Sequence, residues 1–252
     1  KYRFILKWGE ATDSYDLSGK ITQTSQHRPS NEQIIQALSL FKGQIMQQPP
    51  RLSAVHINGQ RAYTLARNNV EFTTKPKLVN ITSFNYLESP QKDQSLFEIT
   101  CSSGTYIRSI AHDFALSLES CGHVCHLTRL QSGPFLIENT ISLDEFEKKA
   151  HKTVADHLLL PLETGLDGIP ALVLEQADIA KIHYGQPVYI VDYKDFKTIE
   201  TQHKKCSGQN YFVALFSKDT DCSTKKICGI GMIKDCYLYP KRLFNLNHQD
   251  TA

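Results

Sequence analysis

The hydrophobic pattern changes its period between residues 95 and 118, and this change constrains the fold more than any other feature of the chain. Residues 95–101 alternate and are rich in β-branched and aromatic side chains, which predicts a strand. From residue 107 the apolar side chains recur every three or four positions, which predicts a helix. Gly104 lies between them and permits a turn that a side chain would resist. A strand that turns into a helix is therefore expected here.

Arg108 lies in the first turn of the predicted helix and off its apolar stripe. The helix dipole favours anions at this end and disfavours cations. A guanidinium in such a place indicates a nearby anion, either a carboxylate or a phosphate. The alternative is a solvated arginine that tolerates the small electrostatic cost. Spacing alone leaves both interpretations open.

The remaining pattern predicts an α+β fold in two parts, the first with a mixed or antiparallel sheet and flanking helices. Strands are predicted at residues 1–9, 20–24, 53–57, 77–87, 95–101 and 122–130. Capping boxes at Ser30 and Ser142 begin two helices, the second ending near residue 152, and residues 60–67 form a third. After a linker at 158–168, one helix is expected at 176–183 and short strands at 171–174, 188–191, 211–216, 228–233 and 236–239. This pattern of short strands separated by polar turns predicts a small β-barrel of roughly 75 residues.

Composition narrows the class of protein. The 252 residues suffice for two ordinary domains, and no run of 18 apolar residues exists to span a membrane. The net charge is only +2, but residues 1–130 hold 14 Lys and Arg against 10 Asp and Glu. A mildly basic front part permits nucleic-acid binding without requiring it. Because the sequence starts at Lys1 and shows no signal peptide, we expect it to begin inside a longer protein.

The seven cysteines indicate reduced thiols, because their number is odd and no secretory signal is present. Cys121, His123, Cys125 and His126 crowd together, which raises the alternative of a zinc site. A second ligand pair at the spacing of a structural zinc site is missing, so zinc is not favoured. We expect a cytoplasmic protein.

An ordered set of short motifs runs through the first 165 residues. The motifs are Lys1-Tyr2-Arg3-Phe4; Thr12-Asp13-Ser14 with Asp16 and Gly19; Pro49 with Ser53-Ala54; Gly59 with Tyr63, Ala66 and Arg67; Ser103-Gly104-Thr105-Tyr106-Ile107-Arg108; His123 with Leu127, Arg129 and Leu130; and Gly133 with Phe135. In this order and spacing they resemble the bacterial TruB family of tRNA pseudouridine-55 synthases. The tail resembles a PUA RNA-binding domain, through Gly185 with Val188 and Gly229-Ile230-Gly231 with Pro240-Lys241-Arg242. The resemblance implies a catalytic domain at 1–165 and a PUA-like β-barrel at 166–245.

The resemblance also implies an activity, the isomerisation of a uridine in the T loop of tRNA. Such an enzyme must take the base out of its stack to reach it. By resemblance, Tyr2 packs on the flipped base and assists proton removal, and Tyr106 and Leu127 line the uridine pocket. Arg108 matches the arginine that pairs with the catalytic aspartate and would favour its charged form. The family implies tRNA as partner, no cofactor or metal, and a monomer with neither a membrane nor a protein partner.

Each of these residues also has a plainer structural interpretation. Tyr2 is then a strand-end tyrosine at the rim of the core, Tyr106 an aromatic rim residue, and Leu127 ordinary core. Asp13 is a candidate second partner for Arg108, although an acidic turn residue is the commoner explanation.

The chain departs from the family in one respect. The nucleophilic aspartate of the family lies in a Gly-x-x-x-His-x-Gly-x-Leu-Asp-Pro segment, and these residues contain none. In the family that segment precedes the position of Lys1, so we expect the nucleophile upstream and the chain alone to be inactive. Asp13, Asp16 and Asp113 match other positions and are not assigned as nucleophile. The alternative is a non-catalytic module that binds or folds tRNA.

Overall fold

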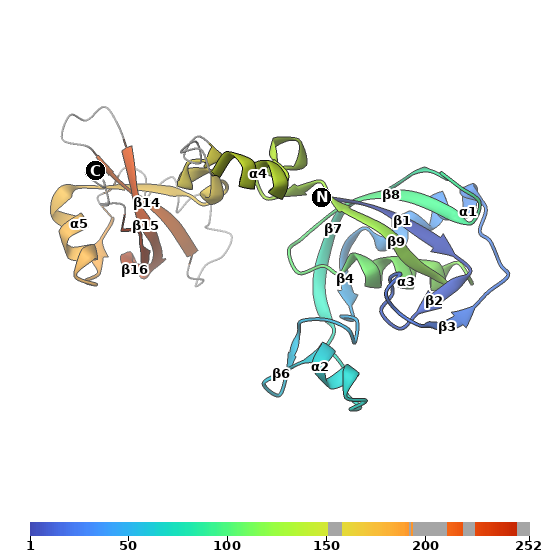
Figure 1. The fold of residues 1–252 in the computed structure, drawn as a ribbon. Coiled ribbons are helices and arrows are strands. Elements are labelled where there is room, and N and C mark those ends of the chain that lie inside the picture. The colour runs from blue at the N-terminus through green and yellow to red at the C-terminus, as the bar shows by residue number, and fades with distance from the viewer. Residues whose placement is uncertain (151–157, 192, 194–210, 219–224, 246–252) are drawn as a thin grey trace. The chain divides into compact units, whose positions relative to one another are not determined.

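The structure is a computed structural model that describes residues 1–150, 158–191, 193, 211–218 and 225–245 (Figure 1). The chain forms two compact units, Lys1–Thr140 and Ile141–Ala252, which are described separately. Both combine helices with antiparallel strands, so the predicted α+β class is confirmed. The domain boundary expected after residue 165 remains a prediction.

The first unit is built on a five-stranded antiparallel sheet. Its strands follow the spatial order β4 (Gly43–Gln47), β7 (Lys77–Glu88), β8 (Gln94–Cys101), β1 (Tyr2–Trp8) and β9 (Gly122–Arg129). The strands expected at 77–87 and 95–101 are confirmed as β7 and β8, which pair as an antiparallel hairpin, and β1 lies between β8 and β9. Because side chains alternate along a strand, β1 buries Phe4, Leu6 and Trp8 on one face.

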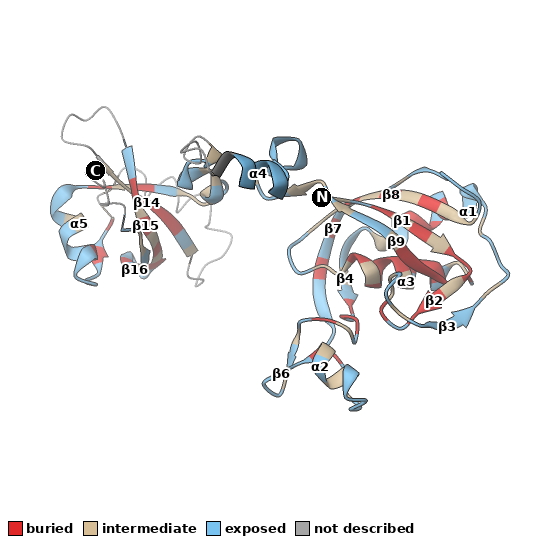
Figure 2. Cartoon of the chain, in the orientation of Figure 1, coloured by how far each residue is buried: buried red, intermediate tan, exposed pale blue. Residues whose placement is uncertain are grey.

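Helix α3 (Ile107–Ser117) covers that face of the sheet, as predicted from its apolar stripe (Figure 1). Figure 2 shows the buried residues gathered on the strands and on α3. Phe4 packs on Phe97 with ring centroids 5.3 Å apart, and Phe114 meets Phe97 edge-on at 5.5 Å. This aromatic core packs α3 against the sheet, and the buried Ile107 and Ile110 hold the start of the helix, next to Arg108, in the same core.

Shorter elements complete the first unit. They are β2 (Glu10–Thr12), β3 (Ile21–Thr24), α1 (Asn31–Ala37), η1 (Leu38–Phe41), β5 (His56–Ile57), β6 (Gln60–Arg61), α2 (Ala62–Arg67), β10 (Gln131–Ser132), β11 (Phe135–Leu136) and η2 (Ile137–Asn139). The capping box predicted at Ser30 is confirmed, because Gln33 N donates to Ser30 Oγ and Ser30 N donates to Gln33 Oε1. Between residues 53 and 67, two expected bounds are wrong: the strand at 53–57 is only His56–Ile57, and the next helix begins at Ala62. The reason is a ribbon in which β5 pairs with β6 across the turn at Asn58 and Gly59, both at positive φ.

The second unit also contains a five-stranded sheet, here with one parallel pair. Its strands follow the order β12 (Ala171–Leu174), β14 (Tyr211–Lys218), β15 (Lys225–Lys234), β16 (Tyr237–Leu243) and β13 (Val188–Tyr189), and β12 pairs with β14 in parallel. Helix α5 (Gln176–His183) matches the prediction. The expected linker contains a 3₁₀ turn, η4 (Leu162–Leu166). A PUA-like barrel remains a prediction.

Helix α4 (Leu143–Ala150) begins as expected after Ser142, whose Oγ accepts a hydrogen bond from Glu145 N at 3.2 Å. Its predicted end near residue 152 lies outside the described residues. Within the described parts of the chain, no helix has both the length and the apolar character that a membrane crossing requires.

Candidate active site around Arg108

Arg108 is held by three oxygen atoms from two different segments. Its Nη1 donates to the carbonyl of Ser14 at 3.0 Å and to Oδ2 of Asp16 at 2.7 Å. Its Nη2 donates to the carbonyl of Leu52 at 3.1 Å. The side chain is 24% exposed, so the solvated alternative is wrong and the expected anion is present as Asp16. Asp13 does not serve as this partner; its Oδ1 instead accepts a hydrogen bond from Lys20 N, as a turn residue does.

The turn at residues 12–18 is organised around the carboxylate of Asp16. Its Oδ1 accepts hydrogen bonds from Ser14 Oγ at 2.7 Å and from Ser18 Oγ at 2.6 Å. Partial burial raises the pKa of Asp16, but the bonds from Ser18 and Ser14 and the charge of Arg108 hold it below its usual value. Asp16 therefore stays ionised and neutralises the guanidinium.

The sequence does not distinguish Asp16 from Asp13 as the partner of Arg108. Both Asp13 and Asp16 lie in the same polar turn, and no spacing rule separates them. The available signal was the pair of serines, Ser14 and Ser18, placed two residues before and after Asp16, where each can reach its carboxylate.

Two hollows meet at Arg108. The first, called the α2 hollow, has a volume of about 870 Å³ and is lined by Asp13, Ser14, Ser18, Gly19, Lys20, Leu52, Ser53, Ala54, Tyr63, Ala66, Arg67, Asn69, Tyr106 and Arg108. The second, called the β9 hollow, has a volume of about 280 Å³ and is lined by Asp16, Leu17, Ser18, Arg108, Val124, Cys125, His126 and Leu127. The structure thus brings Arg108 together with Tyr106 in one hollow and with Leu127 in the other.

The backbone of Tyr106 is anchored by a side chain from strand β4, whereas the side chain of Leu127 is open to solvent. Tyr106 precedes α3, and the buried amide of Gln47 holds its backbone: Tyr106 N donates to Gln47 Oε1 at 2.8 Å, and Gln47 Nε2 donates to Tyr106 O at 3.0 Å. This anchor crosses 59 residues of sequence and had no sequence signal. Leu127 is 44% exposed, so its interpretation as ordinary core is wrong.

Tyr2 lies on the same strand pair as Leu127 but lines neither hollow. Tyr2 faces Arg129 across the β1–β9 ladder, and Phe4 faces Leu127 two positions further on. The guanidinium of Arg129 lies 5.4 Å from the centroid of the Tyr2 ring, which also packs against the aromatic core. The structure fits the rim interpretation, and the role of Tyr2 in catalysis stays a prediction.

The α2 hollow is also lined by Tyr63, whose aromatic ring has two cations near it. The guanidinium groups of Arg61 and Arg67 lie 6.0 Å and 5.8 Å from the centroid of the Tyr63 ring. Ser53 also lines this hollow, and its buried Oγ has no hydrogen-bond partner among the described residues. Aromatic faces and guanidinium groups are the surfaces on which unpaired bases stack and to which phosphates bind.

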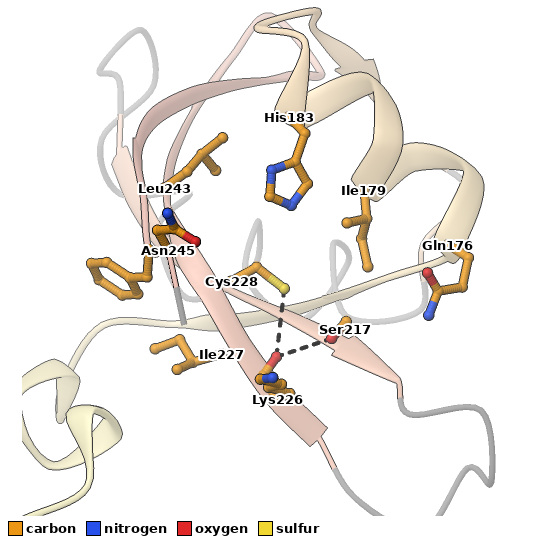
Figure 3. A pocket seen from close by; sticks show the side chains of 10 residues that line it. Gln176, Ile179, His183, Ser217, Lys226, Ile227, Cys228, Leu243 and Asn245 are labelled. Carbon is orange, nitrogen blue, oxygen red and sulfur yellow. Dashed lines mark hydrogen bonds between the residues drawn. The ribbon is translucent and has the colours of Figure 1, made fainter. Parts of the chain in front are cut away.

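A further hollow, of about 560 Å³, lies in the second unit between α5 and the strands β14 and β15 (Figure 3). His183 points into it from the helix, opposite Cys228 and Lys226. It contains none of the site residues expected from the sequence. In the described parts of the chain, no three His, Cys, Asp or Glu side chains are grouped so that they could hold a metal ion.

Comparison with known proteins gives matches over nearly the whole chain. Residues 1–107 match the family model "TruB family pseudouridylate synthase (N terminal domain)", and residues 108–167 match "tRNA pseudouridylate synthase B C-terminal domain". A relative from Bradyrhizobium diazoefficiens, named tRNA pseudouridine synthase B, is 36% identical over 98% of this chain and 68% of its own length. One of the same name from Caulobacter vibrioides is 37% identical over 97% of this chain and 76% of its own length.

Solved structures show the same fold at much lower sequence identity. A Cbf5-Nop10-Gar1 complex contains a chain that matches with a TM-score of 0.65 and 17% identity, over 96% of this chain and 65% of that chain. An H/ACA RNP bound to a substrate RNA matches with a TM-score of 0.59 and 15% identity, over 96% of this chain and 66% of that one. The chain thus spans about two thirds of the length of several proteins that it matches. From the family models and the curated relatives together, we conclude that the chain belongs to the TruB family of pseudouridine synthases, which are tRNA-modifying enzymes.

Proposed function

We propose that the protein containing this chain isomerises a uridine of the T loop of tRNA, at position 55, to pseudouridine. The observation that carries the proposal is Arg108, a guanidinium fixed where two hollows meet. A guanidinium has five N–H donors. The guanidinium of Arg108 donates three hydrogen bonds, to Ser14, Asp16 and Leu52. Its other N–H groups can therefore donate to a further carboxylate.

The nucleophile in this proposal is an aspartate from a part of the protein outside these 252 residues. Its carboxylate would approach Arg108, and the guanidinium would favour its charged form, which a nucleophile requires. Asp16 is unsuited to that role, because both of its oxygens already accept hydrogen bonds within the turn and from Arg108. The chain alone would then bind RNA without turning it over.

The uridine in this proposal leaves the base stack and enters the β9 hollow. Leu17 and Leu127 give this hollow apolar walls, and both side chains are exposed, as substrate contacts must be. Tyr106 approaches Arg108 from the other hollow, and Tyr2 would meet the flipped base once the proposed aspartate is in place beside Arg108. The reaction needs no cofactor or metal.

The α2 hollow and the second unit would bind the rest of the T stem-loop. Tyr63 between Arg61 and Arg67 offers a stacking surface with adjacent positive charge. The second unit is proposed to act as a PUA-like RNA-binding domain. We also propose that the protein is a cytoplasmic monomer.

A non-catalytic tRNA-binding or tRNA-folding module is the alternative, and the closed Asp16–Arg108 pair favours it. In that case the guanidinium is a structural cation whose charge is already neutralised. Such a module binds tRNA with an affinity that falls as salt rises, because phosphate contacts release counterions.

The two functions are separated by one experiment. The full-length protein is incubated with a T stem-loop RNA, and pseudouridine is measured by chromatographic separation of the digested nucleosides, because the isomerisation leaves the mass unchanged. A second RNA in which the target uridine is replaced by cytidine is the control. The enzyme produces one pseudouridine in the first RNA only. Salt-dependent binding of both RNAs without product contradicts the enzyme and supports the module.

A further inference from the structure

Tyr15 occupies the position between the two acceptors of Arg108, Ser14 and Asp16. Its backbone has φ of 62°, the left-handed conformation that disfavours residues with a side chain. Such a conformation persists only where the surrounding structure holds it in place. The turn therefore needs a contact outside itself at the point where it meets Arg108.

That contact is a stacked pair of rings. The ring of Tyr15 lies flat on the ring of His112, with centroids 3.9 Å apart and an angle of 12° between the planes. His112 follows Arg108 by one helical turn, so both side chains lie on the same face of α3. Nδ1 of His112 is buried without a hydrogen-bond partner among the described residues, so packing determines where its ring lies.

Strand β9 holds the same turn from its other side. Val124 N donates to the carbonyl of Tyr15 at 3.0 Å, and Asp16 forms an isolated parallel bridge with Val124. The turn is thus attached at three points: the carboxylate of Asp16 on Arg108, the ring of Tyr15 on His112, and the backbone on β9. Tyr15 and His112 line neither the α2 hollow nor the β9 hollow.

We propose that Tyr15 and His112 are positioning residues for Arg108. Their stacked rings hold residues 14–16 in the register in which the Ser14 carbonyl and the Asp16 carboxylate both meet Nη1. Without the stack, the turn is free to relax from its left-handed conformation, and Arg108 loses its fixed direction toward the reacting carboxylate. The proposal rests on the function proposed above, because it assigns these rings a part in the same reaction.

The test compares two variants of each ring in the complete enzyme. Tyr15→Leu and His112→Leu remove the stack, whereas Tyr15→Phe and His112→Phe keep an aromatic ring. We expect the leucine variants to lower kcat by about 10- to 100-fold with KM for the RNA nearly unchanged, because a small misplacement of a catalytic group is costly. The phenylalanine variants should keep most of kcat. Tyr86→Leu, which removes a ring that packs on Phe97 in the same unit, is the matched control and should leave kcat unchanged.

A double-mutant cycle separates positioning from general loss of stability. If the stack acts through Asp16 and Arg108, Tyr15→Leu has no further effect on kcat in an Asp16→Asn background. Additive losses, or a loss in Tyr15→Phe equal to that in Tyr15→Leu, overturn the proposal. His112→Leu breaks the same stack from the helix and replaces Tyr15→Leu if the turn variant does not fold.

A substrate-free measurement keeps this test independent of the proposed activity. In protein labelled with ¹⁵N-arginine, the side-chain resonances of Arg108 are assigned by their absence in Arg108→Lys. We expect them to broaden or shift in Tyr15→Leu and to stay in place in Tyr15→Phe and Tyr86→Leu. Unchanged resonances in Tyr15→Leu contradict the positioning role, whereas failure of the wild-type enzyme to make pseudouridine contradicts only the proposed function.

Discussion

Two sets of residues near Arg108 are held in place in opposite ways. They are the turn at residues 12–18, called the turn wall, and the residues around Tyr63 in the α2 hollow, called the α2 wall. The turn at residues 12–18 is closed by hydrogen bonds, with Asp16 bound to Ser14, Ser18 and Arg108 at once. The α2 wall has few such constraints: its ring, Tyr63, is approached by two guanidinium groups at about 6 Å, and no carboxylate fixes either of them among the described ion pairs.

This difference indicates different tasks for the two walls. A side chain that stabilises a charged group during a reaction has to be fixed in advance, because reorganisation during the reaction would lower the rate. A surface that receives several nucleotides benefits from adaptable cations and an aromatic ring on which bases stack. The turn wall therefore suits chemistry, and the α2 wall suits RNA binding.

The largest effect is expected from Arg108→Ala in the complete enzyme. Loss of a fixed guanidinium should lower kcat by about 10³-fold, since a single preorganised electrostatic contact contributes up to that much. Binding of the T stem-loop, measured by filter binding, should largely survive. Equal losses of turnover and binding would show that Arg108 serves the RNA backbone and would break the comparison between the walls.

Gln47→Ala tests the hydrogen bonds that hold Tyr106, which lines the α2 hollow beside Arg108. The buried amide of Gln47 pairs with both backbone groups of Tyr106, and its removal leaves Tyr106 N without that acceptor and Tyr106 O with the bond from Ile110 N alone. We expect the free energy of unfolding, measured with urea, to fall by about 2–3 kcal/mol. Gln48→Ala, which removes a neighbouring exposed amide that donates to Thr74 O at 3.3 Å, is the control and should cost less. Comparable losses in the two variants would show that the Tyr106 anchor has no special weight.

Substitutions in the α2 wall should affect binding and leave chemistry intact. We expect Tyr63→Ala to weaken binding of the T stem-loop about tenfold through lost stacking. Arg67→Ala should reduce the slope of log K against log salt by about 1, as loss of one phosphate contact does. Single-turnover rates at saturating RNA should stay unchanged for both. A lower saturating rate would place the α2 wall in the chemistry.

The smallest expected effect is the pH dependence of the Asp16–Arg108 pair. Because the pKa of Asp16 is lowered in the folded protein, its stabilising contribution is present above the unfolded pKa of about 3.9 and is lost as pH falls below it. The difference in unfolding free energy between wild type and Asp16→Asn should be about 1 kcal/mol at pH 6 and should shrink below about pH 4. A difference that grows toward acid would contradict the sign of this pKa shift.

Much of the local structure followed from the sequence. Alternation predicted β1 and β8, helical spacing predicted α3, and Ser30 with Gln33 predicted the start of α1. These features depend on neighbours within a few residues. The ribbon of β5 and β6 was missed because two-residue strands carry too short a pattern to be distinguished from a helix start.

The sequence by itself determined that a cation begins α3 in an electrostatically unfavourable place, and it left two interpretations open, a nearby anion or a solvated side chain. Only the tertiary structure decided which anion: Asp16 rather than Asp13, 92 residues away along the chain. It likewise decided that Gln47 holds Tyr106, that His112 receives Tyr15, and that Leu127 is exposed. The physical reason is that helix dipoles and hydrophobic periods are local properties. Partners across a fold depend on how strands and turns pack, which no short window of sequence contains.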